Sequence, residues 1–156
     1  MSEQAEHLAI ERLEPLIGEW RMTAVFPAAS GMTTSEPAGE ARVVFEWLSG
    51  RRFVVQRWTV PHPAAPDGIA IIGFDPHMGT YMQHYFDSRG VARLYGMGFA
   101  DGVWQLWRTS PDFSALDFSQ RYTGRFSDDG SSIRGNWEIS RDGSIWEHDF
   151  ELTYTR

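Results

Sequence analysis

The sequence of 156 residues is long enough for one domain with a full hydrophobic core, and its aromatic content of 14% favours β-strands. It contains no Cys, which excludes disulfides and thiolate chemistry, and its net charge of −7 argues against a nucleic-acid partner. Residues 1–12 lack the basic start and apolar run of a signal peptide, and no segment has the length and hydrophobicity of a membrane span. We therefore expect a cytoplasmic protein without a membrane partner.

The first segment, residues 2–17, is expected to be a short helix. Its apolar residues recur at intervals of three and four and would share one face of that helix. Pro15 would break a longer helix, because proline lacks a backbone N–H and its ring clashes with the preceding turn. Residues 15–18 are therefore expected to form a separate tight turn before the first strand.

After Gly18 the hydrophobic pattern changes to a period of two, which is typical of half-buried strands. Turn sequences, most of them ending in Gly, then recur between short runs that are rich in β-branched and aromatic residues. This rhythm predicts about ten strands. Their expected ranges are 19–26, 41–48, 52–60, 69–75, 80–87, 91–99, 103–109, 117–126, 131–140 and 145–156.

Short sequential hairpins favour an up-and-down meander over a two-layer sandwich, and a meander of this length hides its edges by closing. The predicted fold is all-β: a single domain, residues 1–156, forming a closed antiparallel barrel of about ten strands with a short N-terminal helix. Residues 110–116 contain Pro111 and are expected to form a loop at the barrel rim. In that position Phe113 could cover the mouth of an internal cavity.

The tripeptide Gly18-Glu19-Trp20, which follows the predicted helix, resembles the G-x-W signature of calycins, the group that contains the lipocalins. In calycins the Trp packs across the closed end of the barrel, and an Arg of the last strand often stacks on it. The resemblance implies a contact between Trp20 and Arg156. The predicted topology implies the same contact, because the first strand starts and the last strand ends at the same end of an even-stranded meander.

A broader set of segments resembles an uncharacterised, bacterial, lipocalin-like family of unknown function. The resemblance is carried by residues 13–20, 72–76, 85–90 and 142–146, in that order along the chain. It implies a barrel with an internal cavity. It implies no reaction, since none is assigned to the family.

His148, on the last predicted strand, carries a narrower resemblance to nitrobindins, which are ten-stranded barrels that hold haem through a His of the last strand. The resemblance implies a haem whose axial ligand is His148. Independently, His148 shares its side-chain phase with Trp146 and Phe150, so its ring is expected to face the interior near the open end. A structural histidine, bonded to a neighbouring Tyr or carbonyl, is the alternative.

Two other strands leave their inward face undecided. In residues 80–87 either the set containing His84 or the set containing Tyr85 faces the interior. Arg57 could point inward and bind a carboxylate, or point outward over Trp58. The periodicity of the sequence does not distinguish these arrangements.

The expected function is the binding of a small, largely apolar molecule in the barrel interior. Histidines with metal-ligand spacing and a nucleophile elbow are both absent from the sequence, so an enzyme is the less favoured hypothesis and no metal is expected. The alternatives are a haem-binding barrel, an enzyme with His148 or His84 as acid/base, and a structural or interaction protein with a filled core. A homodimer is a possible oligomeric state. The expected ligand-binding residues are His148, His84, Arg57, Tyr85, Trp146 and Phe150.

Overall fold

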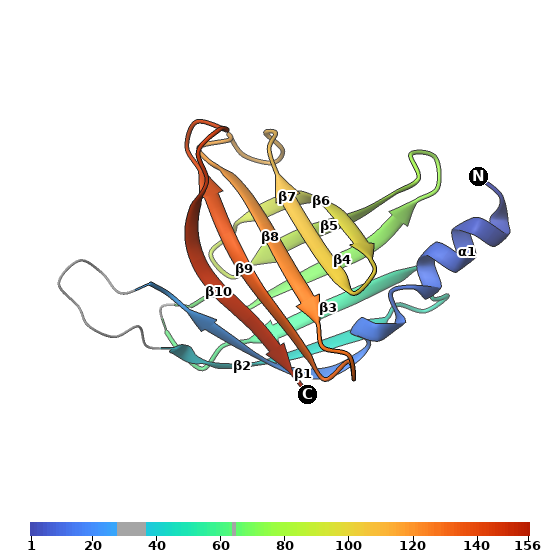
Figure 1. Cartoon of the computed structure of the whole chain (residues 1–156), viewed down its shortest axis with the longest axis horizontal. Coiled ribbons are helices and arrows are strands. Elements are labelled where there is room, and N and C mark those ends of the chain that lie inside the picture. Colours follow the sequence, from blue (N-terminus) through green and yellow to red (C-terminus); the bar gives the residue numbers. More distant parts are fainter. Residues whose placement is uncertain (28–36, 64) are drawn as a thin grey trace.

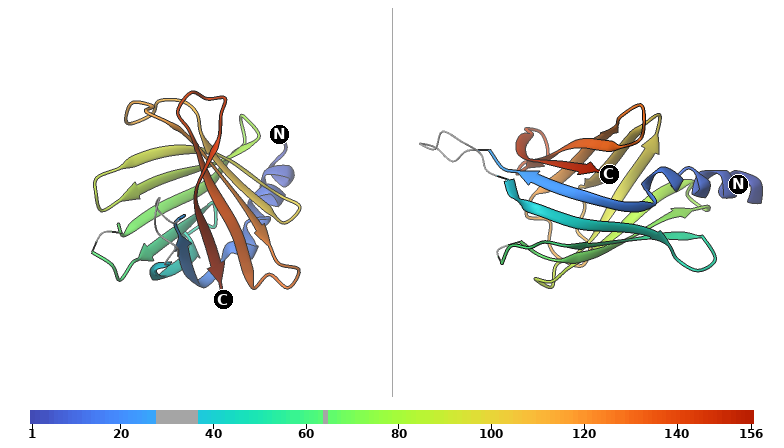
Figure 2. Two further views of the ribbon diagram at one scale, coloured as in Figure 1. Left: turned by 60° about the vertical axis from the view of Figure 1, so that its left-hand side comes forward. Right: turned by 90° about the horizontal axis from the view of Figure 1, so that it is seen from below.

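The computed structural model describes residues 1–27, 37–63 and 65–156. Ten antiparallel strands form a closed barrel in which each strand pairs with its neighbours in sequence (Figures 1 and 2). The predicted up-and-down barrel is therefore confirmed. The strands are β1 (Gly18–Val25), β2 (Pro37–Trp47), β3 (Phe53–Thr59), β4 (Gly68–Asp75), β5 (Thr80–Asp87), β6 (Ala92–Ala100), β7 (Val103–Arg108), β8 (Ser119–Phe126), β9 (Ser132–Ser140) and β10 (Glu147–Thr155).

The barrel closes where the first strand pairs with the last. Arg21 of β1 lies opposite Thr155 of β10, and the pairing continues to Val25 opposite Glu151. This seam satisfies the backbone groups that would otherwise form two exposed edges. The strands curve around a common interior in the views of Figure 2.

The N-terminal segment folds as predicted into a helix and a separate turn. The α-helix α1 (Glu3–Glu11) starts at Ser2, whose hydroxyl accepts a hydrogen bond from the Ala5 N–H at 3.2 Å. It ends before the 3₁₀ turn η1 (Glu14–Leu16), which holds Pro15 in its first turn. Proline is tolerated there because the first N–H groups of a helix have no intrahelical acceptor.

One end of the barrel is closed by Trp20, which is 2% exposed. Its Nε1–H donates to the Leu16 carbonyl at 2.8 Å. The Arg156 guanidinium lies 4.0 Å from the Trp20 ring centroid, and its Nη1 donates to the Ile17 carbonyl at 2.9 Å. The predicted contact between Trp20 and Arg156 is therefore confirmed, as a cation–π interaction reinforced by hydrogen bonds.

The helix α1 packs over the same end. Ala9 and Ile10 are buried against Phe74 of β4, and the Tyr81 hydroxyl of β5 donates to the Ala9 carbonyl at 2.6 Å. The connections β3–β4, β5–β6, β7–β8 and β9–β10 consequently emerge at the opposite end, as an up-and-down topology requires. Of the helices in the described part of the chain, none has the length and apolar character needed to cross a membrane.

The connection between β7 and β8 forms a loop, as predicted for residues 110–116. Its anchor is Asp112, whose two carboxylate oxygens accept from Arg108 Nε at 2.8 Å and Nη2 at 2.9 Å. The side chains of Arg108 and Asp112 are only 3% and 5% exposed. Asp112 also accepts from the Leu94 N–H at 2.8 Å, which ties the loop to β6.

The expectation that Phe113 covers the cavity mouth is wrong. Phe113 is 61% exposed, and its ring centroid lies 6.4 Å from that of Phe86, which is also exposed. Arg108 and the Leu94 N–H hold the Asp112 carboxylate, and in this arrangement of the loop Phe113 is left in solvent. Phe118, five residues further along, lines the cavity instead.

Candidate functional site: the barrel cavity

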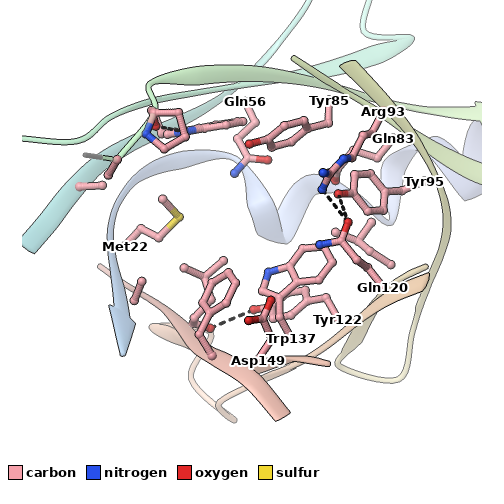
Figure 3. Close-up of a pocket in the computed structure, with 18 of the residues that line it drawn as sticks. Met22, Gln56, Gln83, Tyr85, Arg93, Tyr95, Gln120, Tyr122, Trp137 and Asp149 are labelled. Atoms are coloured by element: carbon pink, nitrogen blue, oxygen red, sulfur yellow. Dashed lines mark hydrogen bonds between the residues drawn. The ribbon is translucent and has the colours of Figure 1, made fainter. Parts of the chain in front are cut away.

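The barrel interior contains a cavity of about 390 Å³, which lies between the end that Trp20 closes and the opposite, open end. The described side chains that line it come from every strand except β4, and its walls are predominantly aromatic and aliphatic (Figure 3). A concave apolar space with a few polar groups is the usual form of a small-molecule site. The apolar lining residues are Met22, Ala24, Phe26, Ala41, Trp58, Val60, Ala65, Pro66, Trp104, Leu106, Phe118, Trp137, Phe150 and Leu152.

Flat aromatic faces dominate one wall of the cavity. Trp137 stacks on Tyr122 with ring centroids 5.3 Å apart and an interplanar angle of 21°. Tyr95 meets the same Trp137 edge to face at 5.6 Å, and Phe150 stacks on it at 6.4 Å. Such pairs hold one another in fixed orientations, so this wall offers a rigid apolar surface to a bound molecule.

Three glutamines place amide groups inside the barrel. Gln56, Gln83 and Gln120 are 3%, 5% and 8% exposed, and all three line the cavity. Gln120 Oε1 accepts from Arg93 Nη1 at 2.7 Å and from the Tyr95 hydroxyl at 3.1 Å. These amides are the polar groups that would orient a ligand.

An ion pair stands at the mouth beside Tyr85. The Asp87 carboxylate is fully buried and accepts from Arg89 Nη2 and from the Tyr85 hydroxyl, each at 2.7 Å. Burial alone would raise the pKa of Asp87, but the hydrogen bonds from Arg89 and Tyr85 outweigh it and lower the pKa to about 2. Asp87 is therefore an ionised anchor for this corner of the rim.

Asp149, unlike Asp87, is among the described residues that line the cavity, and it is the one carboxylate among them. Burial raises its pKa above the ordinary value, and the neighbouring His148 reduces that shift. A carboxylate in this environment is a weaker acid than one in water, because burial disfavours its charged form.

Three buried side-chain atoms have no hydrogen-bond partner in the described structure: Gln83 Oε1, Arg93 Nε and Trp104 Nε1. All three residues line the cavity. An unpaired buried donor or acceptor costs about 1–3 kcal/mol, so native proteins keep few of them. The three unpaired atoms of the described structure therefore belong to residues that border one and the same space.

The expectation that His148 faces the interior is wrong. The pairing of β10 with β9 shifts register between His148 and Phe150, so Asp149 is an extra residue in the strand. This β-bulge moves His148 to the outer face opposite Glu138, where it is exposed, and turns Asp149 inward. His148 cannot act as an axial haem ligand or as an acid/base within the cavity from that position.

Trp146 lies outside the cavity as well. The strand β10 begins at Glu147, not at 145 as expected, so Trp146 belongs to the preceding turn. The Arg121 guanidinium sits 4.1 Å from its ring centroid on the outer surface. Phe150, by contrast, lines the cavity as predicted.

The two undecided strands are resolved by the structure. Gln83 and Tyr85 of β5 line the cavity, so His84 between them faces outward. Arg57 is exposed and forms an ion pair with Glu46 on the outer surface. Of the six expected ligand-binding residues, Tyr85 and Phe150 line the cavity, and the remaining four do not.

Arg93, Gln83 and Gln120 are cavity residues that sequence reasoning did not identify. Each is polar within a β-rich run, and a period-two pattern assigns such residues to the solvent face. Of the three, only Gln83 could have been identified from the strand pattern, because its side chain shares one face of the strand with Tyr81 and Tyr85.

Comparison with known proteins identifies a family and a similar fold. A family model described as "Protein of unknown function (DUF1579)" matches residues 2–156. The crystal structure of Rv2717c from M. tuberculosis is similar, with a TM-score of 0.62 over 95% of this chain and 96% of that chain. The sequence identity is 13%, so this likeness shows the fold alone. No curated protein matches the chain.

Proposed function

The chain belongs to the DUF1579 family, whose function is unknown, and we propose that it binds a small, largely apolar molecule inside its barrel. The observation that carries this proposal is the cavity of about 390 Å³, which has aromatic walls and is lined by all three unpaired buried polar side chains of the described structure. Its volume lies within the range of small-molecule sites, roughly 300–1,000 Å³.

The contents of the wall favour binding over a filled structural core. Protein interiors are packed to the density of organic crystals, so a void of this size sacrifices many dispersion contacts. The glutamine amides and the Trp104 Nε1–H would form hydrogen bonds with a ligand's few polar atoms. A bound molecule would therefore recover both the missing contacts and the missing hydrogen bonds.

The described cavity lining lacks the histidines on which the enzyme hypothesis depended. None of the five histidines belongs to the described residues that line the cavity. His84 and His148 both face outward, which removes the acid/base role proposed for them. Binding is consequently the function that the described lining supports best.

A neutral fluorescent probe tests the proposal. N-phenyl-1-naphthylamine brightens in apolar surroundings and has the flat rings that the Trp137 wall would accept. We expect saturable binding to the wild-type protein. Ala24→Phe should weaken it at least about tenfold, because Ala24 lines the cavity and a larger side chain would occupy ligand space.

Thr23→Phe provides the matched control. Thr23 is the outward neighbour of Ala24 on β1, opposite Glu40 and Thr153 in the pairing, so the same ring is added outside the barrel. The control should bind the probe as the wild type does. Absence of saturable binding to the wild type, or equal binding to a folded Ala24→Phe variant, would contradict the proposal.

A further inference from the structure

Three arginines of the described structure present the same edge of the guanidinium to a carboxylate of the protein. Arg108 uses Nε and Nη2 to bind Asp112, at 2.8 and 2.9 Å. Arg121 uses the same pair of nitrogens on Glu138, at 2.9 and 3.1 Å. Arg89 does so on Asp87, at 3.2 and 2.7 Å to one oxygen. The parallel Nε–H and Nη2–H bonds fit the two oxygens of a carboxylate.

Arg93 differs from these three arginines in its hydrogen-bond partners. Its Nη1 donates to Gln120 Oε1, a neutral amide, at 2.7 Å. Its Nε is buried and unpartnered, and it forms no ion pair within the described ranges of the chain. Figure 3 shows its guanidinium reaching into the barrel above Gln120. In the described structure, neither Nε nor Nη2 of Arg93, the edge that the other three arginines offer to a carboxylate, donates to a carboxylate.

The neighbouring carboxylates of the described structure do not supply the missing partner. Asp87 and Asp112 are each committed to another arginine through two nitrogens. Asp149, on β10, also lines the cavity, but no ion pair joins it to Arg93. A guanidinium that is partly removed from water and lacks a counter-charge is unfavourable, and an anion supplied from outside would correct this.

The apolar surroundings indicate what else such an anion would carry. The Arg93 guanidinium lies 5.6 Å from the ring centroid of Phe118, and Tyr95, two residues further along β6, makes a T-shaped contact with Trp137. A ligand that is held at Arg93 would therefore lay its body along these rings.

From this geometry we propose that the ligand is an amphipathic organic acid: a flat, apolar body with one anionic group, a carboxylate or its equivalent, held by the free edge of Arg93. This inference rests on the proposed function, since it specifies the class of molecule that enters the same cavity. Arg93 is then the residue that determines specificity for an anion over a neutral molecule.

Two dyes that differ by one group provide the test. 8-Anilino-1-naphthalenesulfonate is N-phenyl-1-naphthylamine with an added sulfonate, so the comparison isolates the anionic group. The wild type should bind the sulfonate more tightly than the neutral dye. Arg93→Gln should weaken sulfonate binding about tenfold or more and change binding of the neutral dye by less than about twofold, because charged hydrogen bonds are the strong ones.

Two further variants act as controls. Arg57→Gln removes the same charge from the outer surface, where Arg57 pairs with Glu46, and should leave both dyes unaffected. Arg93→Lys keeps the charge but loses the planar fork, so it should retain part of the preference for the anion. It also supplies a folded comparison if Arg93→Gln unfolds, which near-ultraviolet circular dichroism would reveal.

The outcomes separate the two proposals. If the wild type binds the neutral dye but Arg93→Gln and Arg93→Lys both bind the sulfonate as the wild type does, the anionic ligand is wrong and the apolar cavity site stands. Equal loss of both dyes in a folded Arg93→Gln variant also overturns it, since Arg93 would then merely shape the cavity. If the wild type binds neither dye, both proposals fail.

Discussion

The closed end of the barrel and the cavity are built from the same kinds of residue, but they differ in whether the buried polar atoms have hydrogen-bond partners. At the closed end the Trp20 N–H donates to the Leu16 carbonyl, and the Arg156 guanidinium stacks on the Trp20 ring. Leu13 and Leu16 are fully buried there. Around the cavity, Trp104 has an equally buried ring but an unpartnered N–H within the described structure. Aromatic content alone therefore does not locate a site; unpaired polar atoms beside empty volume do.

The largest effect is expected at the closed end. Replacing Trp20 with Ala should lower the free energy of unfolding by about 3–5 kcal/mol, the usual cost of deleting a buried aromatic side chain. The loss should appear in chemical denaturation, as a lower midpoint with an unchanged slope. An unchanged midpoint would show that this end is not the rigid base of the barrel.

The next largest effect concerns the anchored loop. Asp112→Asn should lower the free energy of unfolding by about 3 kcal/mol, because it leaves the buried Arg108 without a counter-charge. The hydrogen bond from Arg108 holds the pKa of Asp112 well below its usual range. The stabilisation is therefore complete at neutral pH and is lost as pH falls below about 4, the pKa of Asp in the unfolded chain.

Denaturation of Asp112→Asn and wild type across pH checks this directly: the gap between the two proteins should narrow in acid. Glu46→Gln provides the exposed counterpart, since Arg57 and Glu46 are each 56% exposed. That change should cost less than about 1 kcal/mol. A similar cost for both variants would contradict the distinction between buried and exposed pairs.

A smaller effect of opposite sign is expected inside the cavity. Gln83→Leu should raise the free energy of unfolding by about 1 kcal/mol, because it removes a buried acceptor without a partner in the described structure. Gln120→Leu is the matched change and should be destabilising, because Arg93 and Tyr95 both donate to Gln120. Thermal denaturation of the two variants distinguishes them, and destabilisation by both would mean that Gln83 has an unrecognised partner.

The smallest effect is expected at Asp149. Burial raises its pKa, so ionisation of Asp149 is less favourable in the folded protein than in the unfolded chain. The wild type therefore loses stability as pH rises through that pKa, and Asp149→Asn should not. The variant should be more stable at neutral pH by less than about 1 kcal/mol, with no gain in acid below the unfolded pKa. A gain that is equal at both pH values would have another cause.

The sequence predicted the barrel because its local signals agree with one another. Alternation with a period of two, interrupted by glycine turns, recurs through the chain and leaves an up-and-down order as the simplest connection. The pairing of Trp20 with Arg156 followed from that order, since the first and last strands share an end. These features depend on patterns that the chain itself contains.

The cavity lining was much less predictable, for two physical reasons. One extra residue at Asp149 reverses the face on which His148 lies, and periodicity cannot detect a bulge within a strand. Residues such as Gln120 and Arg93 are polar, so a pattern based on hydrophobicity assigns them to solvent when they face the interior. Binding residues are the positions where local preference and the overall fold disagree.

The seam between β1 and β10 also governs how the barrel must assemble. It joins Arg21 to Thr155, residues from opposite ends of the sequence, whereas every other pairing joins neighbouring strands. Ordering so long an intervening chain is entropically costly, so the seam is expected to form late and to limit the folding rate. Until it forms, β1 and β10 each present an open edge that can pair with another chain. The protein is therefore most exposed to aggregation during synthesis and refolding, and protected once the circle is complete.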